Sequence, residues 1–577
     1  MELSEHFSYT LVNTNENYYV PVLGVPSYYV SAVGGVRSNE VRSLASKHNA
    51  IYSDTRLAWK ERYSAHSIGG FVGTRLSFDD FTRKTQLVYN TNSDKTPQIS
   101  AGTKDRTSLG TDESKRNWDW YFQANYNFKE RYFVQANLTA SSSSNVGDDA
   151  KRGGIRIGKV LWGLFPSVQA AWVITNEPWM ASVKGLDYLK LSAGFDMSGN
   201  DDINNFAKRS YFSSTLYLNS ISALAFNGIG NTGIKWETTT RWNIGLDAGL
   251  LENRMRLSLN FFTGTTRDLL RLKELSALTG VEKFWTNSGK LRNKGFDFSA
   301  AGKIIATKDW TWELGATMGH YLNNIKDLDG EEYSDNKLYG ATIRSKVGGV
   351  VNAFYGYQTN GVYATTAEAN AANIKVLGTD GTTYYDVEAG DMRFVDQNGD
   401  GKINNDDMVQ IGNPNPDIYG NIFTSVTWKR FRLDMNFNYS LGNDVYNYMR
   451  SQLEGGSRFL NQTTALTQRW SVEEDITNVP KVAFQDPHGN SRFSDRWIED
   501  GSYLKMKSLT FSYTLPLQSA FIQGLQFWIQ GNNLLVISKY LGSDPEVAAT
   551  NSVIGQGIDI GSIGSSRSIV AGVKINL

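Results

Sequence analysis

The sequence predicts an all-β fold, a transmembrane antiparallel β-barrel with long extracellular loops and short periplasmic turns. Apolar and polar residues alternate along many segments of about ten residues. The connections between these segments alternate between tiny turns and long polar stretches, at 320–340, 364–420, 443–500 and 541–566. No run approaches the roughly 20 apolar residues that a membrane helix needs. A barrel hides its apolar residues at every second position, so it fits all three observations.

The alternation is clearest in residues 117–140. In NWDWYFQANYNF every second residue is aromatic or apolar, and a second alternating run, RYFVQANLTA, follows after only a Lys-Glu pair. Two such runs joined so closely predict a hairpin with a very short turn. Similar turns occur at LEN after Leu250 and at KR after Trp428.

The pattern continues to the end of the chain, and we expect about sixteen strands, many near the 9–11 residues that span a bilayer. A barrel leaves no unpaired edge in lipid, so a terminal strand is expected as well. It would comprise Ile569, Ala571, Val573, Ile575 and Leu577. We therefore expect residues 1–577 to be one partial barrel domain. The alternative is a set of soluble β-sandwiches, whose strands are usually shorter, about 5–6 residues.

Composition excludes several classes of protein. With 58 basic and 58 acidic side chains, the chain lacks the positive charge of a nucleic-acid binder. It has no Cys, hence no disulfide framework and no thiolate site, as suits a protein that crosses an oxidising periplasm. The five His residues show no metal-ligand spacing. No acid–base pair, nucleophile elbow or phosphate-binding loop stands out, so we expect no enzyme.

The segment DQNGDGKINNDD matches the twelve-residue calcium loop of EF-hands. Carboxylate and amide oxygens at alternate positions converge on a hard cation, and Gly401 permits the sharp turn. Position 12 is Asp rather than Glu, so Asp406 is an alternative last ligand. The other interpretation is an ordinary Asx-rich turn. We expect a structural Ca²⁺ in the extracellular loop 364–420, held by Asp396, Asn398, Asp400, the Lys402 carbonyl, Asn404 and Asp407.

Three aromatic residues in the predicted loops are candidate substrate contacts. Trp285, Tyr355 and Tyr357 have rings that suit stacking on sugar faces. The alternative is that they pack within the loops or join the aromatic girdle of the barrel.

The chain resembles the SusC/RagA family of TonB-dependent outer-membrane transporters of Bacteroidota. The resemblance is carried by GDMRFVDQNGDGKINNDDMVQIGNPNPDIYGN, and FPSVQAAWVITNEPWM, NSGKLRNKGFDFS and SYLKMKSLTFSYTLP agree in order, over roughly residues 117–577. It implies a 22-stranded barrel with an amino-terminal plug and a TonB box. It also implies a SusD-like surface lipoprotein as a lid, for which the long loops are the expected contact surface.

The sequence departs from that family at its start, because MELSEHFSYTLV has no signal-peptide pattern and no plug or TonB box follows. The expected explanation is a carboxy-terminal fragment, ending at Leu577, or a truncated gene product. We thus expect the barrel part of an outer-membrane importer of glycans or peptides, with TonB coupling through the missing part. A passive or non-functional barrel and a secreted calcium-stabilised binding protein are the alternatives.

Overall fold

The computed structural model describes residues 1–577 except 31–34, 152, 218–220, 282, 518–521, 523 and 577. Leu577, the predicted end of the last strand, therefore lies outside the described residues. In the described part the two α-helices, α1 (Thr366–Ala372) and α2 (Tyr448–Glu454), are each seven residues long. Neither is long or apolar enough to cross a membrane. The chain divides into two units, which we describe separately.

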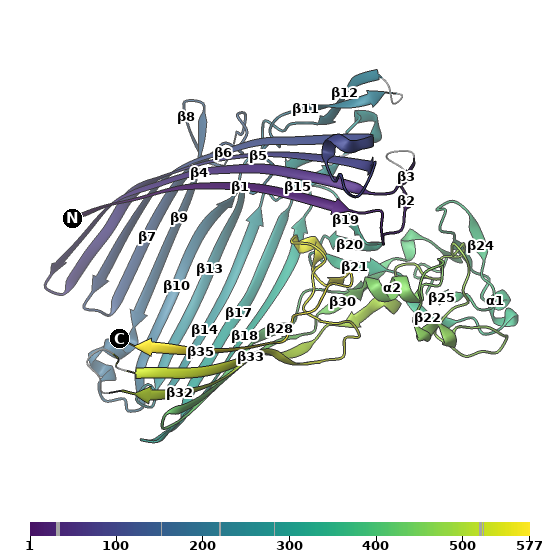
Figure 1. The fold of residues 1–577 in the computed structure, drawn as a ribbon. Helices are drawn as coiled ribbons and strands as arrows, with labels where there is room; N and C mark the ends of the chain where they lie inside the picture. Colours follow the sequence, from purple (N-terminus) through teal and green to yellow (C-terminus); the bar gives the residue numbers. More distant parts are fainter. Residues whose placement is uncertain are drawn as a thin grey trace. The chain divides into compact units, whose positions relative to one another are not determined.

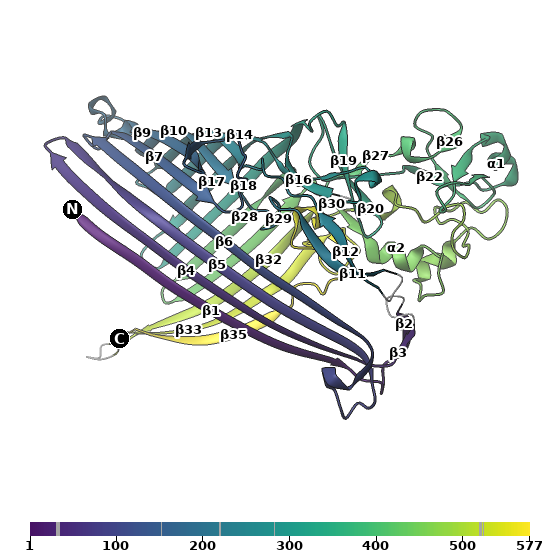
Figure 2. The same ribbon diagram turned by 90° about the horizontal axis from the view of Figure 1, so that it is seen from above.

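Unit 1 comprises residues 1–172, 192–242 and 266–288. Its long strands pair in antiparallel order through registers that are mostly continuous, and Figure 2 shows the first four of them side by side. They are β1 (Glu2–Val20), β4 (Glu40–Tyr63), β5 (His66–Thr91), β6 (Gly102–Phe128), β7 (Tyr132–Ser143) and β9 (Val160–Val173). β4, β5 and β6 have 24, 26 and 27 residues. These lengths exceed what a bilayer requires, so the strands continue well beyond it.

Unit 2 comprises residues 173–191, 243–265 and 289–577. Seven of its strands form a second antiparallel series. In pairing order they are β17 (Lys290–Ala306), β18 (Trp310–Asp327), β28 (Ile418–Trp428), β29 (Phe431–Leu441), β32 (Tyr503–Pro516), β33 (Gly524–Ser538) and β35 (Ser568–Asn576). Three further strands have residues in both units, namely β10 (Leu186–Asn200), β13 (Glu237–Leu250) and β14 (Met255–Arg267). In the described part of the chain, the six long strands of unit 1, the seven of unit 2 and these three make sixteen, in agreement with the predicted number of about sixteen.

The predicted short turns are present. Phe128 pairs with Tyr132 across a turn in which Lys129 and Glu130 have φ of +55° and +56°. Trp428 pairs with Phe431, so only two residues connect β28 to β29. The left-handed backbone of these turns matches the twist of the flanking strands. The hairpin expected in residues 117–140 is thereby confirmed.

The strands of unit 2 have one apolar and one polar face. Ile422 lies opposite Phe437, and Phe511 lies opposite Ile529, with 45% and 48% of those last two side chains exposed. Exposed apolar side chains in a continuous row are what a lipid-facing wall presents. On the opposite face, neutral amides bond to one another, for example Asn421 Nδ2 to Asn438 Oδ1 at 3.0 Å. This face is the lumen side.

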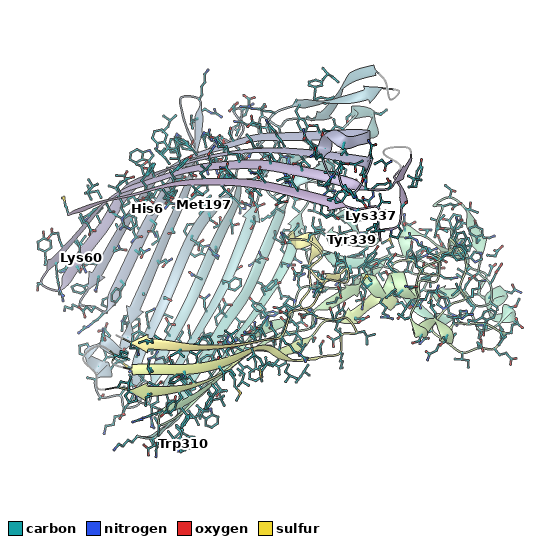
Figure 3. All side chains as sticks on the ribbon, viewed as in Figure 1. His6, Lys60, Met197, Trp310, Lys337 and Tyr339 are labelled. Carbon is teal, nitrogen blue, oxygen red and sulfur yellow. The ribbon has the colours of Figure 1, made fainter. Side chains whose placement is uncertain are left out.

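The three long connections of unit 2, residues 328–417, 442–502 and 539–567, fold together, and we call them the loop module. They lie at the strand ends opposite the short turns (Figure 1). We call the antiparallel strand series of unit 2 the wall. Figure 3 labels Trp310 at its short-turn end and Lys337 and Tyr339 in the loop module. The stretches predicted as loops 364–420 and 443–500 thus contain α1, α2 and several short strands, separated by irregular segments such as residues 469–493.

Small sheets make up the loop module. The four-stranded sheet contains β19 (Tyr333–Leu338), β20 (Ala341–Lys346), β21 (Ala353–Gly356) and β27 (Val409–Gly412). The others are β22 (Thr359–Val362) with β25 (Met392–Phe394); β23 (Lys375–Leu377) between β24 (Tyr384–Asp386) and β26 (Lys402–Ile403); and β30 (Asp444–Asn447) between β31 (Ile498–Asp500) and β34 (Ile558–Asp559). A buried core around Phe354, Tyr446 and Trp497 draws residues from all three connections.

Candidate metal site and polar clusters of the loop module

The predicted calcium loop lies between β25 and β27 and contains β26. The Asp396 carboxylate accepts the backbone N–H of Gly399 at 2.7 Å and of Gly401 at 2.8 Å. Gly401 has φ +76°, a left-handed conformation that favours glycine. Burial raises the pKa of Asp396, but the N–H groups of Gly401 and Gly399 outweigh it and hold that pKa below its usual value. The first ligand position is therefore kept ionised.

The twelfth position of the loop is occupied by Asp407, whose side chain is fully buried. Its carboxylate accepts the backbone N–H of Gln397 at 2.9 Å and of Asn404 at 2.8 Å. Asp406 is exposed, and its backbone N–H donates to Asn404 Oδ1. Of the two candidates for the last ligand, Asp407 is thus the one that the loop folds around.

The donor set of this loop fits a hard cation, because it consists of carboxylate, amide and carbonyl oxygens. The two Asp407 bonds each leave the oxygen with a further lone pair. The carboxylates of Asp396, Asp400 and Asp407 are, however, not among the groups of acidic or His side chains that converge within 4.8 Å in the described residues. The Ca²⁺ ion stays a prediction.

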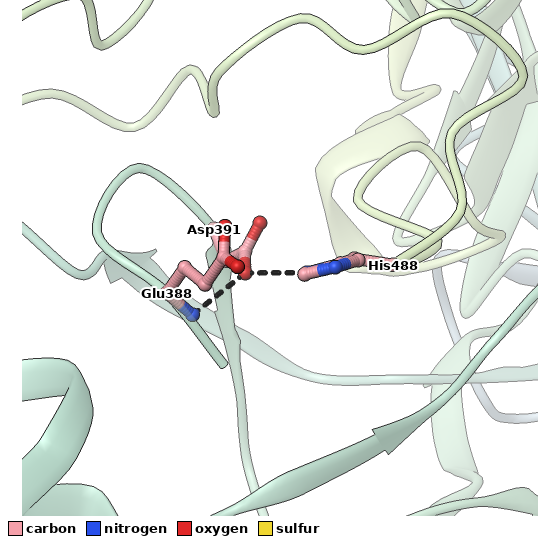
Figure 4. A group of neighbouring side chains, drawn as sticks. All are labelled: Glu388, Asp391 and His488. Carbon is pink, nitrogen blue, oxygen red and sulfur yellow. Dashed lines mark hydrogen bonds and ion pairs between the residues drawn. The ribbon is translucent and has the colours of Figure 1, made fainter. Parts of the chain in front are cut away.

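The described group that does converge is Glu388, Asp391 and His488 (Figure 4). Asp391 has 1% of its side chain exposed, and His488 Nδ1 lies 2.8 Å from its Oδ2. The Lys481 ammonium lies 2.7 Å from Glu388 Oε2 and 3.2 Å from Asp391 Oδ1. The protein itself therefore supplies the cation of this cluster.

Sequence reasoning missed this cluster because Asp391 and His488 stand 97 positions apart. Asn490 completes it by donating from Nδ2 to Asp391 Oδ1 at 2.9 Å. The cluster of Glu388, Asp391, His488 and Asn490 joins the connection 328–417 to the connection 442–502 and so holds the loop module together.

A second buried ion pair joins the last connection to the wall. Lys505 of β32 is completely buried, and its Nζ lies 2.8 Å from Asp544 Oδ2 and 3.1 Å from Glu546 Oε2. Ser565 Oγ accepts from the same ammonium at 2.8 Å, and its backbone N–H donates to Asp544. A buried cation satisfied by three partners fixes the geometry of the loop that provides them.

The predicted aromatic contacts fall in different surroundings. Trp285 is half-buried in β16 (Lys283–Asn287) of unit 1, opposite Leu272 of β15 (Leu270–Glu274). Tyr355 is half-buried in β21, with the Arg344 guanidinium 4.9 Å from its ring centroid. Tyr357 is 8% exposed in a hydrophobic core and lies beneath Arg492 at 5.0 Å. Because it is buried in this core, its ring is a packing element of the module, and the same burial raises the pKa of Tyr357.

Comparison with known proteins identifies the fold. The family described as TonB dependent receptor-like, beta-barrel, matches residues 4–447. TonB-dependent receptor P3 of Formosa agariphila is 26% identical over 100% of this chain and 56% of its own length. SusC of Bacteroides thetaiotaomicron is 28% identical over 74% of this chain and 41% of its own length. The chain thus spans about half the length of these relatives.

Among solved structures, the RagAB peptide transporter superposes with a TM-score of 0.81 at 21% identity, covering 99% of this chain and 59% of that chain. At this identity the likeness establishes the fold alone. Members of the matched family are transporters of the outer membrane, not enzymes. With its lipid-facing strands and its loop module, the chain belongs to the TonB-dependent receptor family and is an outer-membrane β-barrel of the SusC/RagA kind.

Proposed function

We propose that the chain is the barrel part of an importer for oligomeric nutrients, glycans or peptides, that works with a SusD-like surface lipoprotein and is energised through TonB. The family match over residues 4–447 is the observation that carries the proposal, and RagAB, a named peptide transporter, shares the fold. SusC, a second relative, supports the same class. Because the chain spans about half of these relatives, coupling to TonB is assigned to the whole protein.

Beside the charged residues Glu313, Arg432 and Asp434, the lumen face of unit 2 carries a row of neutral polar side chains that suits a polar substrate. Beside the Asn421–Asn438 bond, Thr510 Oγ1 donates to Gln530 Oε1 at 3.2 Å and Gln530 Nε2 donates to Asn532 Oδ1 at 2.6 Å. Amide and hydroxyl groups donate and accept hydrogen bonds without net charge. Sugar hydroxyls and peptide backbones present the same complementary groups, so this face suits both substrate classes.

Uptake measurements on the full-length native protein in its host test the proposal. We expect deletion of the gene to abolish accumulation of one labelled class, oligosaccharides or oligopeptides, and re-expression to restore it. Collapse of the proton gradient should stop uptake in the re-expressing strain. Accumulation that survives this collapse would favour the passive barrel, and unchanged accumulation after deletion would refute import altogether.

The lid partner of the proposed importer is expected to sit on the loop module, because rigid strands position these loops at the outer rim. Affinity purification of the native protein should recover a surface lipoprotein in an amount equimolar with the barrel protein. Replacing Phe459 and Phe484, which are exposed and stacked on one another, by Ser should abolish that recovery. Recovery that is unaffected would place the lid elsewhere.

We further propose that the loop Asp396–Asp407 binds one structural Ca²⁺. The support is its donor set and the buried Asp407, around which the backbone already turns. Millimolar extracellular calcium would saturate even a weak site of this kind. Such an ion would stiffen the loop and the small sheet of β23, β24 and β26 that borders it.

Limited proteolysis with and without a calcium chelator tests this site. We expect chelation to accelerate cleavage within residues 396–407, and the double variant Asp396→Ala/Asp400→Ala to be cleaved fast under both conditions. Asp380→Ala, which changes an exposed Asx turn outside the loop, is the matched control. If chelation leaves the wild-type cleavage rate unchanged, the calcium proposal is wrong.

A further inference from the structure

Three cationic side chains line one pocket of about 450 Å³ beside the loop-module ends of β17 and β18. They are Arg292 and Lys294 of β17 and Lys326 of β18, and all three are exposed. The rest of the pocket is lined by Leu322, Asn323, Asn324, the segment Gly348–Val350 and Gln410. No carboxylate lines this pocket in the described part of the chain.

The strand register places these cations on the outer face of the wall. Lys294 pairs with Leu322 and Arg292 with Asn324, in the same register that pairs Phe298 with Met318 and Phe296 with His320. Phe296 contacts the exposed ring of Phe261, with 6.1 Å between the centroids. Residues at every second position share a face of a strand. Arg292 and Lys294 therefore continue the row of Phe296 and Phe298.

The opposite face of the same strands is the lumen side. Asn293 lies opposite Asn323, and Ser299 lies opposite Thr317. Asn323 Oδ1 accepts the backbone N–H of Val351, so it points toward the loop module. The three cations thus lie on the side of the wall that faces lipid, and Asn323 reaches the pocket from the neighbouring position of β18.

The height of the pocket can be worked out from strand geometry. A strand tilted by about 40° climbs roughly 2.5 Å per residue along the barrel axis, so an apolar band about 25 Å tall takes roughly ten residues. Starting from Trp310 at the short-turn end, the band ends near His320. Leu322, Asn324 and Lys326 then lie about 5–15 Å above the band. That is the layer of the lipid headgroups.

The charges in this pocket are not neutralised by the protein. Within the described residues, the side chains of Arg292, Lys294 and Lys326 make no ion pair and no hydrogen bond. Asn324 is held in place by donating from Nδ2 to the Gly348 carbonyl at 2.5 Å. Three like charges brought into one pocket repel one another, and an anion removes that repulsion.

We propose that Arg292, Lys294 and Lys326 bind the phosphate groups of an outer-leaflet lipid. Guanidinium and ammonium groups are the protein's usual phosphate ligands, and the arginine fork binds phosphate oxygens in pairs. Leu322, 43% exposed, and the apolar row below the pocket accept the acyl chains of the same molecule. The site rests on the outer-membrane location and is independent of what the barrel transports.

The test measures lipid binding by the full-length protein purified from the outer membrane in mild detergent. The probes are a diphosphorylated glycolipid (lipid A), its dephosphorylated form and inorganic phosphate, each titrated into the same micelles. The triple variant R292Q/K294Q/K326Q is compared with K303Q/K308Q/K574Q, which removes three exposed lysines near the short-turn end. The charge-preserving variant R292K/K294R/K326R and the single variant R292Q guard against a triple variant that fails to fold.

We expect the triple variant to bind the diphosphorylated lipid about 100-fold more weakly, and R292Q about fivefold, because each cation near an anionic lipid surface contributes about 1 kcal/mol. The short-turn control and the charge-preserving variant should bind like wild type. The proposal is overturned if the triple variant binds within threefold of wild type or if the dephosphorylated lipid binds equally well. Inorganic phosphate that binds as tightly as the lipid would also overturn it, in favour of a free-phosphate site.

Discussion

Replacing Lys505 by Met removes the cation that anchors the last connection of the loop module, residues 539–567, to β32. The Lys505 ammonium is buried between Asp544, Glu546 and Ser565. Met preserves the length of the aliphatic stem but leaves the Asp544 carboxylate buried without a cation, with 6% of that side chain exposed. We expect this connection to detach locally while the strands stay paired.

The size of the expected loss of stability follows from the lowered pKa of Asp544. Burial raises its pKa, but Lys505 and the N–H and hydroxyl of Ser565 lower it to about 2 from 3.8. That difference corresponds to about 2.5 kcal/mol of stabilisation. Because the folded pKa is depressed, this stabilisation is present above pH 4 and is lost as the pH falls through about 2. Since Asp544 keeps its Ser565 donors, we expect the variant to lose about 3 kcal/mol, the low end for a broken buried pair.

Hydrogen exchange of residues 539–567 is the suitable assay, because it reports local opening. A loss of about 3 kcal/mol accelerates exchange by roughly 100-fold. Lys507→Met is the matched control, since its partner Glu546 is 39% exposed and the pair contributes little. The double variant Lys505→Met/Asp544→Asn should recover part of the lost stability, because it leaves no unpaired carboxylate buried at position 544. If Lys505→Met accelerates exchange no more than Lys507→Met, the pair does not anchor the connection.

Three further predictions concern the interior of the loop module. Asp391→Ala leaves an ammonium without its buried partner, so proteolysis should become about 100-fold faster at the joint of the first two connections. Trp497→Ala empties the largest fully buried position and should lower the free energy of unfolding of the module by about 3–5 kcal/mol, measured with denaturant. At Gly390, with φ +83°, a Cβ would lie 2.4 Å from Trp470, so Gly390→Ala should lower the thermal midpoint more than the same change at Gly381, where φ is +73° and space is open.

The strands were predictable because each residue of the wall faces one of two solvents. Where both solvents are present, as in residues 117–140, alternation identified the hairpin and its turn. The length of β4 was not predictable in this way. In EVRSLASKHN, residues 40–49 and the half of β4 farther from the short turn, polar residues occupy both faces, because this half extends past the bilayer and the period of two disappears.

The loop module was predicted as loops because its strands are too short to show a period. β23, β25 and β26 have three, three and two residues. Their core is assembled from distant pieces, with Phe354, Tyr446 and Ile558 in one cluster. Such a core depends on contacts that no local pattern records.

The same contrast separates the sites. The calcium loop is contiguous, so its ligand types and Gly401 could be identified in the sequence, and the structure adds that Asp407 is the buried last position. The cluster of Asp391 with His488 depends on pairing across two connections. Arg292 is a third case. From the sequence it is a charged residue on an alternating strand, and only its pairing with Asn324 shows that it lies on the lipid-facing side and above the apolar band. The register that places Phe296 in lipid also places Arg292 in the headgroup layer, so an error in one assignment would make the other wrong as well.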